Sequence, residues 1–244
     1  MDQEKVEVAV QGELFKRRRN EIPDAERVQT LQEKLYQKAN QERSYKFYVL
    51  YDKMFIPYML REAWKSVRTN GGAPGVDRMT IEDVEQYGVE AYLEELGEDL
   101  RKQTYESQAV KRVMIPKANG GERPLGIPTV RDRIAQTVCK MILEPIYEAD
   151  FEESSFCFRP DRSSKDAMTA IKENLKEGKT AVYDADLSKY FDTIPHDKLQ
   201  VALKERIADP RLLKLINKWL KVSVCEGVNT RVGRRTTKEH HKVE

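Results

Sequence analysis

Apolar residues recur at helical spacing through most of the chain, and this pattern predicts the larger elements. The first 70 residues combine good helix formers with apolar positions three and four apart, which predicts a helical N-terminal part with Pro57 near a helix boundary. A loose capping box at Thr80 and Asp83 predicts that one or two helices start there and reach residue 103. The same periodicity predicts helices at 130–144, where Pro145 ends the pattern, and at 163–178, 195–207 and 209–224.

Strand signals lie between these helices. Residues 109–116 are a strand candidate, and the dipeptide Asn119-Gly120 after them is a strong signal for a hairpin turn. We therefore expect this segment to pair with residues 117–128. The run 179–187 predicts a third strand, whose side chains alternate across a sheet. Because helices and strands interleave, the fold is expected to be α/β or α+β.

Composition agrees with a soluble chain of one to two domains. The 244 residues are enough to bury a sizeable core, and 34% of them are charged against 39% hydrophobic. The longest apolar runs fall far short of the about 20 residues that a membrane span needs, and the N-terminus lacks the apolar core of a secretion signal. Cys139, Cys157 and Cys225 are odd in number and far apart, which fits neither a disulfide framework nor a CxxC zinc site. We expect a reducing, cytoplasmic compartment and no membrane.

Charge is balanced over the whole chain, at a net +2, but not along it. Residues 81–99 contain eight acidic and no basic side chains, whereas residues 101–135 contain eight basic and three acidic ones. A positive surface beside an acidic one is typical of a phosphate-binding cleft, and two ordinary solvated faces explain the pattern equally well. The basic residues are Arg101, Lys102, Lys111, Arg112, Lys117, Arg123, Arg131 and Arg133.

Two aspartates on the strand expected at 179–187 carry the main chemical signal. Alternation places Val182, Asp184 and Asp186 on one face of the sheet. Carboxylates gathered on a strand face are costly unless they are solvated or bind a cation, and their oxygens suit Mg²⁺ together with substrate phosphates and water. Spacing alone predicts either the metal-binding face of a phosphoryl-transfer site or two exposed aspartates at a strand end.

Four longer segments are more specific than this pair of carboxylates. Asp186 begins the run DLSKYFDTIPHDKL, which resembles the first carboxylate motif of reverse transcriptases, Asp-x-x-x-aromatic-Phe-Asp-x-Ile. The other three are similar to segments of the reverse transcriptases that group II introns encode, and all four follow the order of that family. The three segments are GGAPGVDRMTIEDV at 71–84, the stretch at 110–151, and SSFCFRPDRSSKDAM at 154–168.

This resemblance implies an α+β fold of the right-hand polymerase kind. Residues 1–70 would be a helical N-terminal extension, residues 71–180 the reverse transcriptase fingers with their β-hairpin, and residues 181–244 part of the palm. The implied function is RNA-directed DNA synthesis on a group II intron RNA, with a maturase role in splicing. The implied partners are that RNA, a DNA primer or target and deoxynucleoside triphosphates, with Mg²⁺ as the cofactor. Whether two copies of the chain form a homodimer is left open.

Metal and sugar roles follow from the first carboxylate motif. The resemblance implies that Asp186 is the first metal-binding carboxylate and that Leu187 adds its backbone carbonyl oxygen. Asp184 is expected outside the direct metal shell. Phe191 matches the aromatic residue that packs under the incoming sugar and excludes a 2′-hydroxyl, which would favour deoxynucleotides. The alternative is that Phe191 is an ordinary core residue.

The resemblance assigns nucleotide binding to three basic residues. Lys117 and Arg123 flank the expected hairpin turn and match fingers residues that grip the triphosphate, where charge-assisted contacts stabilise developing negative charge. The alternative for both is an exposed pair on a hairpin. Arg159 matches the arginine of the family's Phe-Arg-Pro segment and is assigned to nucleotide binding, with a role as a buttress of the palm left open. Cys157 and Asp161 depart from the family, which usually has glycine at both positions.

One expected motif is missing from the chain. A complete reverse transcriptase needs a second palm strand with aromatic-x-Asp-Asp, and no adjacent aspartate pair follows Asp186. The last six residues, 239–244, can be encoded GAG CAC CAC AAG GTG GAG. Insertion of one G after Lys238 makes these bases read Gly-Ala-Pro-Gln-Gly-Gly, the next motif of the family. We therefore expect a one-base deletion that shifted the frame; a chance or designed tail, such as a cloning scar, is the alternative.

Two other functions remain open on sequence grounds. The first is a non-catalytic RNA-binding fragment, which the missing carboxylate pair favours for the polypeptide as it stands. The second is a reverse transcriptase of a retron or a diversity-generating element. The segments RPLGIP and FRP favour the intron branch instead.

Overall fold

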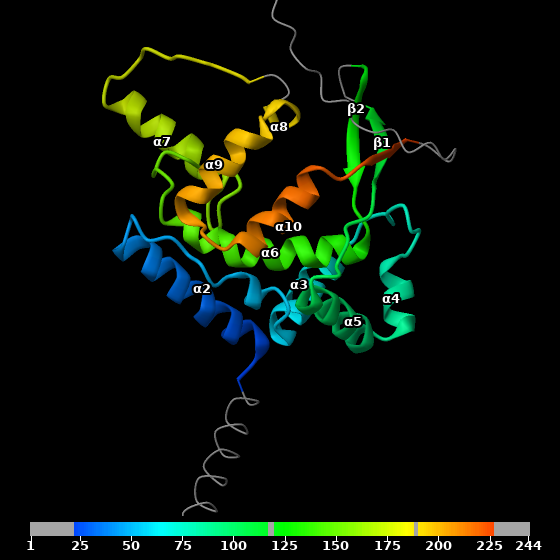
Figure 1. The fold of residues 1–244 in the computed structure, drawn as a ribbon. Coiled ribbons are helices and arrows are strands. Elements are labelled where there is room, and N and C mark those ends of the chain that lie inside the picture. Colours follow the sequence, from blue (N-terminus) through cyan, green and yellow to red (C-terminus); the bar gives the residue numbers. More distant parts are fainter. Residues whose placement is uncertain (1–21, 117–119, 188–189, 227–244) are drawn as a thin grey trace, which may run out of the picture.

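Helices make up most of the fold, and a small sheet stands at one side of them (Figure 1). The computed structural model describes residues 22–116, 120–187 and 190–226. This mixture of helices and strands is the expected α+β fold class. In chain order the elements are α2 (Asp24–Gln41), η1 (Tyr51–Lys53), α3 (Pro57–Asn70), α4 (Ile81–Tyr87), α5 (Val89–Lys102), β1 (Val110–Pro116), β2 (Glu122–Ile127), α6 (Val130–Glu148), α7 (Ser164–Lys176), α8 (Tyr190–Thr193), α9 (His196–Arg206), α10 (Pro210–Leu220) and β3 (Val224–Glu226).

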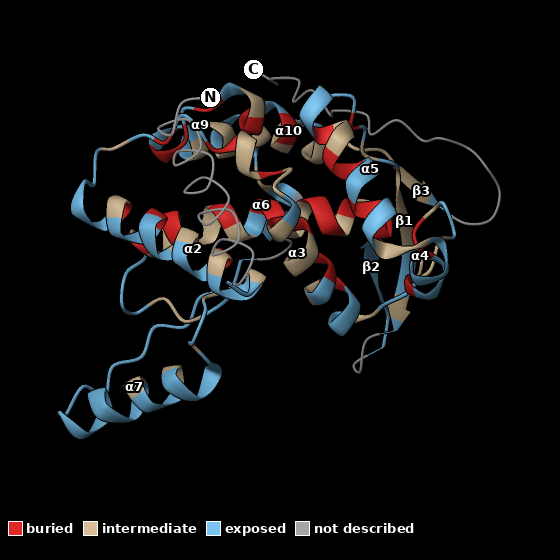
Figure 2. Cartoon of the chain, turned by 90° about the horizontal axis from the view of Figure 1, so that it is seen from below, coloured by how far each residue is buried: buried red, intermediate tan, exposed pale blue. Residues whose placement is uncertain are grey.

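The apolar core is built around α6, on which α2 and α3 pack. Figure 2 shows buried residues gathered along α6 and on the faces of its neighbours that turn toward it. Fully buried aliphatic side chains follow one face of α6 along its length, and α5 and α10 add leucines to the same cluster. These helices therefore form the rigid base from which the sheet projects. The fully buried aliphatic residues of α6 are Val130, Ile134, Val138, Ile142 and Ile146.

The one or two helices expected between Thr80 and residue 103 are two, α4 and α5. Gly88 has a φ of +106°, a conformation that other residues rarely adopt, and it separates α4 from α5. The capping box is also present: the Asp83 amide donates to Thr80 Oγ1 at 3.1 Å, and the Thr80 amide donates to Asp83 Oδ2 at 2.8 Å.

The predicted end of α6 at Glu144 is wrong, because the helix continues through Pro145 to Glu148. Proline has no amide hydrogen, so the carbonyl oxygen of Met141 loses its partner four residues on. Gln32, from α2, replaces that partner: its Nε2 donates to the Met141 oxygen at 3.0 Å. A buried helix can therefore pass the proline without leaving this carbonyl unpaired.

The expected hairpin is confirmed, and it gains a third strand. β1 and β2 pair antiparallel, with Lys111 opposite Ile127 and Ile115 opposite Arg123, and β3 adds to β1 in parallel. The sheet order is β2-β1-β3. The sequence did not predict β3, since the apolar spacing at 209–224 reads as one helix, whereas α10 ends at Leu220. Of the turn dipeptide, Asn119 lies outside the described residues.

The strand predicted at 179–187 does not form. Residues 180–187 are coil, and every one of them is exposed; Val182 retains 82% and Tyr183 92% of its accessible surface. The segment has no strand partner among the described residues, and a lone strand leaves its backbone groups unpaired and its side chains unpacked. The prediction is therefore wrong for this structure. α7, just before it, has no buried residue and is exposed along nearly its whole length in Figure 2.

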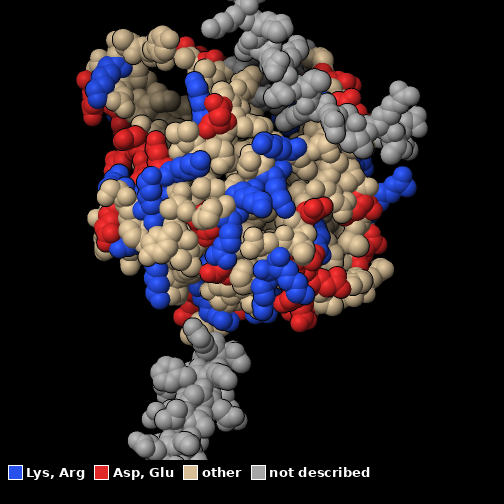
Figure 3. Space-filling view, viewed as in Figure 1, with Lys and Arg blue, Asp and Glu red and all other residues tan. Residues whose placement is uncertain are grey.

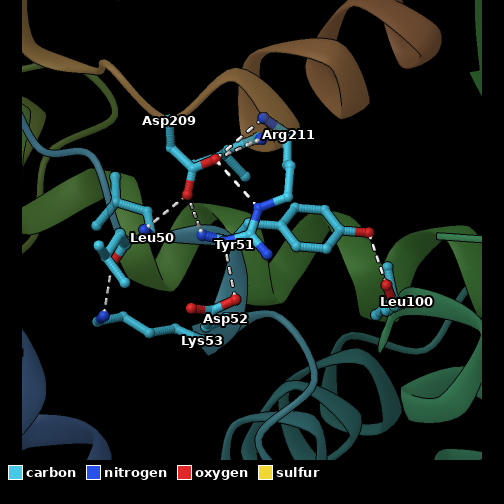
Figure 4. A network of polar contacts seen from close by, with 9 residues as sticks. Leu50, Tyr51, Asp52, Lys53, Leu100, Asp209 and Arg211 are labelled. Atoms are coloured by element: carbon cyan, nitrogen blue, oxygen red, sulfur yellow. Dashed lines mark hydrogen bonds and ion pairs between the residues drawn. The ribbon is translucent and has the colours of Figure 1, made fainter. Parts of the chain in front are cut away.

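Asp209 ties the start of α10 to the core (Figure 4). Its carboxylate is fully buried and accepts the amides of Leu50 at 2.9 Å and Tyr51 at 2.8 Å. It also accepts the amides of Arg211 and Leu212 in the first turn of α10, at 3.0 and 3.4 Å. Burial raises the pKa of Asp209, but the backbone donors more than offset it, so the pKa lies below its ordinary value of 3.8. Asp209 is thus both the N-cap of α10 and its link to η1.

None of the helices within the described ranges has the length and apolar character required to cross a membrane.

Candidate functional site

A buried polar network fixes the base of the β1–β2 hairpin. Asp132, in the first turn of α6, accepts Thr129 Oγ1 at 2.9 Å, the Gln108 amide at 3.2 Å and the hydroxyl of Tyr105. Trp219 of α10 donates its indole N–H to the Tyr105 oxygen at 3.2 Å. Burial, followed by the charge of Asp132, raises the pKa of Tyr105, so the hydroxyl keeps its proton. The network connects α6, α10 and the chain that enters β1, and so sets where the hairpin projects.

Arg123 lies on this hairpin, in β2, and its side chain is exposed. Lys117, its expected companion across the turn, lies outside the described residues. Arg123 is therefore accessible to a ligand, and the role of the two cations in gripping a triphosphate stays a prediction.

Two arginines of the expected basic stretch form ion pairs with described residues, and both pairs are partly open to solvent. Arg112, on β1, pairs with Glu226 of β3. Arg131, on α6, lies 2.5 Å from an oxygen of Asp99 on α5. In both pairs a carboxylate already offsets the charge of the arginine, which weakens the pull of these two cations on a phosphate.

A third arginine of that stretch closes the glycine-rich loop at 71–77. Arg133 donates from α6 to the carbonyl oxygens of Gly71 at 3.0 Å and Ala73 at 2.8 Å. Gly75, in the same loop, packs directly on the start of α6, where a Cβ would lie 2.7 Å from the Thr129 Cα. The first of the four motifs is thus a loop clamped onto α6, which explains its small residues.

Asp186 and Leu187 both lie on the exposed segment 180–187, and Leu187 retains 70% of its surface. No group of three or more His, Cys, Asp or Glu side chains that could hold a metal ion occurs among residues 22–116, 120–187 and 190–226. One carboxylate and one backbone carbonyl do not fix a divalent ion. The described residues therefore do not make a metal site by themselves, and the metal role of Asp186 and Leu187 stays a prediction.

Phe191 lies at the surface and is not a core residue. The residue retains 75% of its accessible surface, and its ring meets that of Phe158 edge to face, with 6.2 Å between centroids and 86° between planes. Tyr190 lies beside it at 5.4 Å. The structure thus brings the FRP segment and the first carboxylate motif together through exposed rings. Sequence reasoning missed Phe158, although its place before Arg159 in the same segment was a signal.

In a longer protein with a completed palm, Phe191→Val is expected to raise ribonucleotide use relative to deoxynucleotide use by about tenfold, because a smaller side chain removes the obstruction to a 2′-hydroxyl. The ratio of kcat/KM values for the two sugars measures this. Because the ring is exposed, the free energy of unfolding should fall by less than about 1 kcal/mol. An unchanged ratio would remove Phe191 from the site.

Arg159 is held by protein groups on every side. Its guanidinium contacts both oxygens of the Glu148 carboxylate, at 2.6 to 3.1 Å, and donates to the carbonyl oxygens of Glu152 and Ser155 at 2.6 and 2.9 Å. Only 5% of its side-chain surface is exposed. Arg159 therefore ties the FRP segment to the end of α6 here, and contact with a nucleotide stays a prediction.

Backbone strain marks one of the two positions where the family usually has glycine. Positive φ falls on Phe158, at +59°, and on Asp161, at +56°, but not on Cys157. Asp161→Gly is expected to stabilise the chain by about 0.5–1 kcal/mol, since glycine adopts this conformation without a steric cost. The matched variant Cys157→Gly should instead destabilise it, because it only adds freedom to the unfolded chain. Thermal or denaturant unfolding measures both, and equal effects would contradict the interpretation.

Comparisons with known proteins agree with these motifs. A family described as Reverse transcriptase (RNA-dependent DNA polymerase) matches residues 115–242. Protein YkfC of Escherichia coli (strain K12) is 40% identical over 171 residues, covering 68% of this chain and 45% of that protein. The Group II intron-encoded protein LtrA of Lactococcus lactis subsp. cremoris is 33% identical over 178 residues, covering 72% of this chain and 29% of LtrA. The Uncharacterized 91 kDa protein in cob intron of Schizosaccharomyces pombe is 35% identical over 178 residues, covering 72% of this chain and 21% of that protein.

The helical core with its projecting hairpin is consistent with the α+β fold of the fingers-and-palm class of proteins. The chain belongs to the reverse transcriptase (RNA-dependent DNA polymerase) family. Two of these relatives are named for introns, which confirms the resemblance to the group II intron branch. Members of this family use divalent metal ions and act on nucleic acids. The chain spans less than half the length of these relatives.

Proposed function

We propose that the protein carries out RNA-directed DNA synthesis on a group II intron RNA and assists the splicing of that RNA. The observation that carries the proposal is the order of the four motifs, which the family match at 115–242 supports. Residues 1–70 serve as the N-terminal extension, 71–180 as the fingers and 181–244 as part of the palm. A DNA primer and deoxynucleoside triphosphates are the substrates, and Mg²⁺ is the divalent ion.

Each candidate residue then has one task in the addition of a nucleotide. The 3′-hydroxyl of the primer attacks the innermost phosphate of the triphosphate, and pyrophosphate leaves. Lys117 and Arg123 hold the triphosphate from the hairpin, where their charges offset the negative charge that develops. Phe191 limits the sugar to the deoxy form. Asp186 is the palm carboxylate that positions the reacting groups together with a second carboxylate motif.

A second function fits the described residues by themselves. Asp186 stands on an exposed segment without a neighbouring carboxylate cluster among the residues described. A chain in this state binds RNA and does not polymerise. This function shares its RNA partner with the first one but lacks the chemical step.

Binding of the purified chain to a group II intron RNA tests what the two functions share. Affinity is expected to fall by orders of magnitude between roughly 50 and 200 mM salt, because several phosphates are neutralised and their counterions are released. A fluorescence titration at several salt concentrations measures this. The control is a single-stranded RNA of equal length and charge without the intron structure. Absence of binding, or a flat salt titration, would count against both functions.

A further inference from the structure

One face of α10 carries a line of four cations. Arg211, Lys214, Lys218 and Lys221 follow one another at intervals of three, four and three residues, which places them on one side of the helix. The opposite side is apolar, and its buried leucines belong to the core. Figure 3, viewed as Figure 1 is, shows Lys and Arg side chains gathered over the middle of the face where α10 lies. We call these four residues the α10 stripe.

Three members of the α10 stripe keep their charge uncompensated. Arg211 pairs with Asp52 at 2.9 Å and lies 3.7 Å from Asp209. Lys214, Lys218 and Lys221 are exposed, and none of them has an ion pair with a described residue. The helix itself contains no acidic residue. Within the described ranges nothing neutralises these lysines, so they present a local positive field to an anion.

A small hollow lies along the α10 stripe. It measures about 40 Å³, and its lining includes the stripe residues Arg211, Lys214 and Lys218 together with Gln103 and Tyr105. Lys218 Nζ already donates to the Tyr105 carbonyl oxygen at 3.3 Å, which holds this ammonium group at the rim. A hollow of this size is too small to enclose a nucleoside, so it suits a phosphate group that rests on the surface.

The α10 stripe matches the charge spacing of a nucleic-acid backbone. Ten residues of helix advance about 15 Å, and one strand of a duplex presents about four phosphates over that length. An anionic membrane fits less well, because surface-bound helices insert apolar side chains, whereas Leu212, Leu213 and Leu215 are buried in the core. The position of the stripe is also fixed, since Trp219 and Asp209 anchor α10 at both ends.

We propose that the α10 stripe is a docking surface for the phosphate backbone of RNA, with Lys214, Lys218 and Lys221 as the contacting residues. The proposal rests on the proposed function in that it supplies the surface through which the chain holds its RNA. It places the main RNA contact on α10 rather than on β1 and α6, where Arg112, Arg131 and Arg133 already have partners among the described residues. The lysines contact phosphate groups and not bases, so binding at this surface does not depend on the RNA sequence.

The test replaces the three lysines together, Lys214→Gln, Lys218→Gln and Lys221→Gln, in the full chain. The probe is a labelled RNA duplex of about 20 base pairs, titrated at several salt concentrations. We expect the affinity at low salt to fall at least about tenfold and the slope of log affinity against log salt to become shallower by about 2. A loss of folding alone would lower the fraction of active protein without changing that slope.

The matched control removes the same charge from another exposed helix. Lys165→Gln, Lys172→Gln and Lys176→Gln on α7 should leave both affinity and slope within about twofold of the parent, since acidic residues interleave with these lysines. Equal losses in both triple variants would overturn the proposal. If the parent binds RNA and the α10 variant keeps its slope, the docking surface is wrong while the proposed function stands. If the parent binds no RNA, both fail. The parent and the α10 variant are also titrated with vesicles of anionic lipid. If the α10 variant loses binding to the vesicles but not to the RNA, the stripe is a membrane contact and the proposal is overturned.

Discussion

In a longer protein whose palm carries the aromatic-x-Asp-Asp motif, Asp186→Asn is expected to lower the rate of DNA synthesis on an RNA template by about a thousandfold. The substitution keeps the size of the side chain and removes its charge. Charge stabilisation at a phosphoryl-transfer site is worth several kcal/mol, and about 4 kcal/mol corresponds to that factor. Incorporation of labelled deoxynucleotide in a primer-extension assay measures the rate. We expect no incorporation by the chain of 244 residues, since its sequence has one carboxylate motif and the described ranges contain no carboxylate cluster that could hold a metal ion.

Asp184→Asn is the matched control for this variant. Asp184 lies two residues away on the same exposed segment, carries the same charge and is expected outside the metal shell. Its substitution should reduce incorporation by less than about tenfold, which separates a general charge effect from a specific one. Equal losses in the two variants would contradict the assignment of Asp186. Incorporation by the 244-residue chain that disappears in Asp186→Asn would show that the second motif is not required.

Asp209→Ala is expected to destabilise the chain by about 3 kcal/mol. The change removes the N-cap of α10 and leaves buried amides without an acceptor, and each of these losses costs roughly 1–2 kcal/mol. The melting temperature should fall by about 10 °C. The exposed Asp197, in the first turn of α9, is the control, and Asp197→Ala should change stability by less than about 0.5 kcal/mol.

The contribution of Asp209 should also depend on pH. Its pKa in the folded chain lies below the ordinary value of 3.8, so the stability it confers is fully present above that value. This stability is lost as the pH falls through the lower, folded-state pKa. The difference in melting temperature between the parent and Asp209→Ala should therefore be constant from pH 7 to about pH 5 and shrink below about pH 4. A difference that grows on acidification would contradict this role.

Local signals in the sequence were sufficient for much of the fold. The capping box at Thr80 and the turn at Asn119-Gly120 depend on residues within a few positions of each other, and the structure contains the expected cap and hairpin. The prediction that α6 ends before Pro145 was wrong. Gln32, more than a hundred residues earlier in the chain, donates the hydrogen bond that the proline cannot give to the Met141 carbonyl oxygen. Such compensation by a distant side chain leaves no mark on the local pattern.

The prediction of a strand at 179–187 was also wrong because it depends on residues far away in the chain. The alternation in this segment is real, but a strand forms only beside another strand, and the described residues place none next to it. The basic stretch at 101–135 shows the same limit for charge. The ion pairs of Arg131 with Asp99 and of Arg112 with Glu226 form only in the folded chain, so the sequence alone does not show that these charges are offset. The basic residues of the α10 stripe are three and four residues apart in the sequence, but only the fold shows that the side of α10 opposite to them is buried in the core.

Hydrogen exchange of the amides in residues 181–187 tests most directly whether Asp186 belongs to a palm that needs a second strand. In the 244-residue chain these amides form no backbone hydrogen bond with another described residue, so they should exchange rapidly. In a longer protein with the aromatic-x-Asp-Asp segment, pairing should slow their exchange by about a hundredfold or more. Equally rapid exchange in both proteins would contradict the account, because Asp186 would then lie on a loop rather than on a strand of the palm.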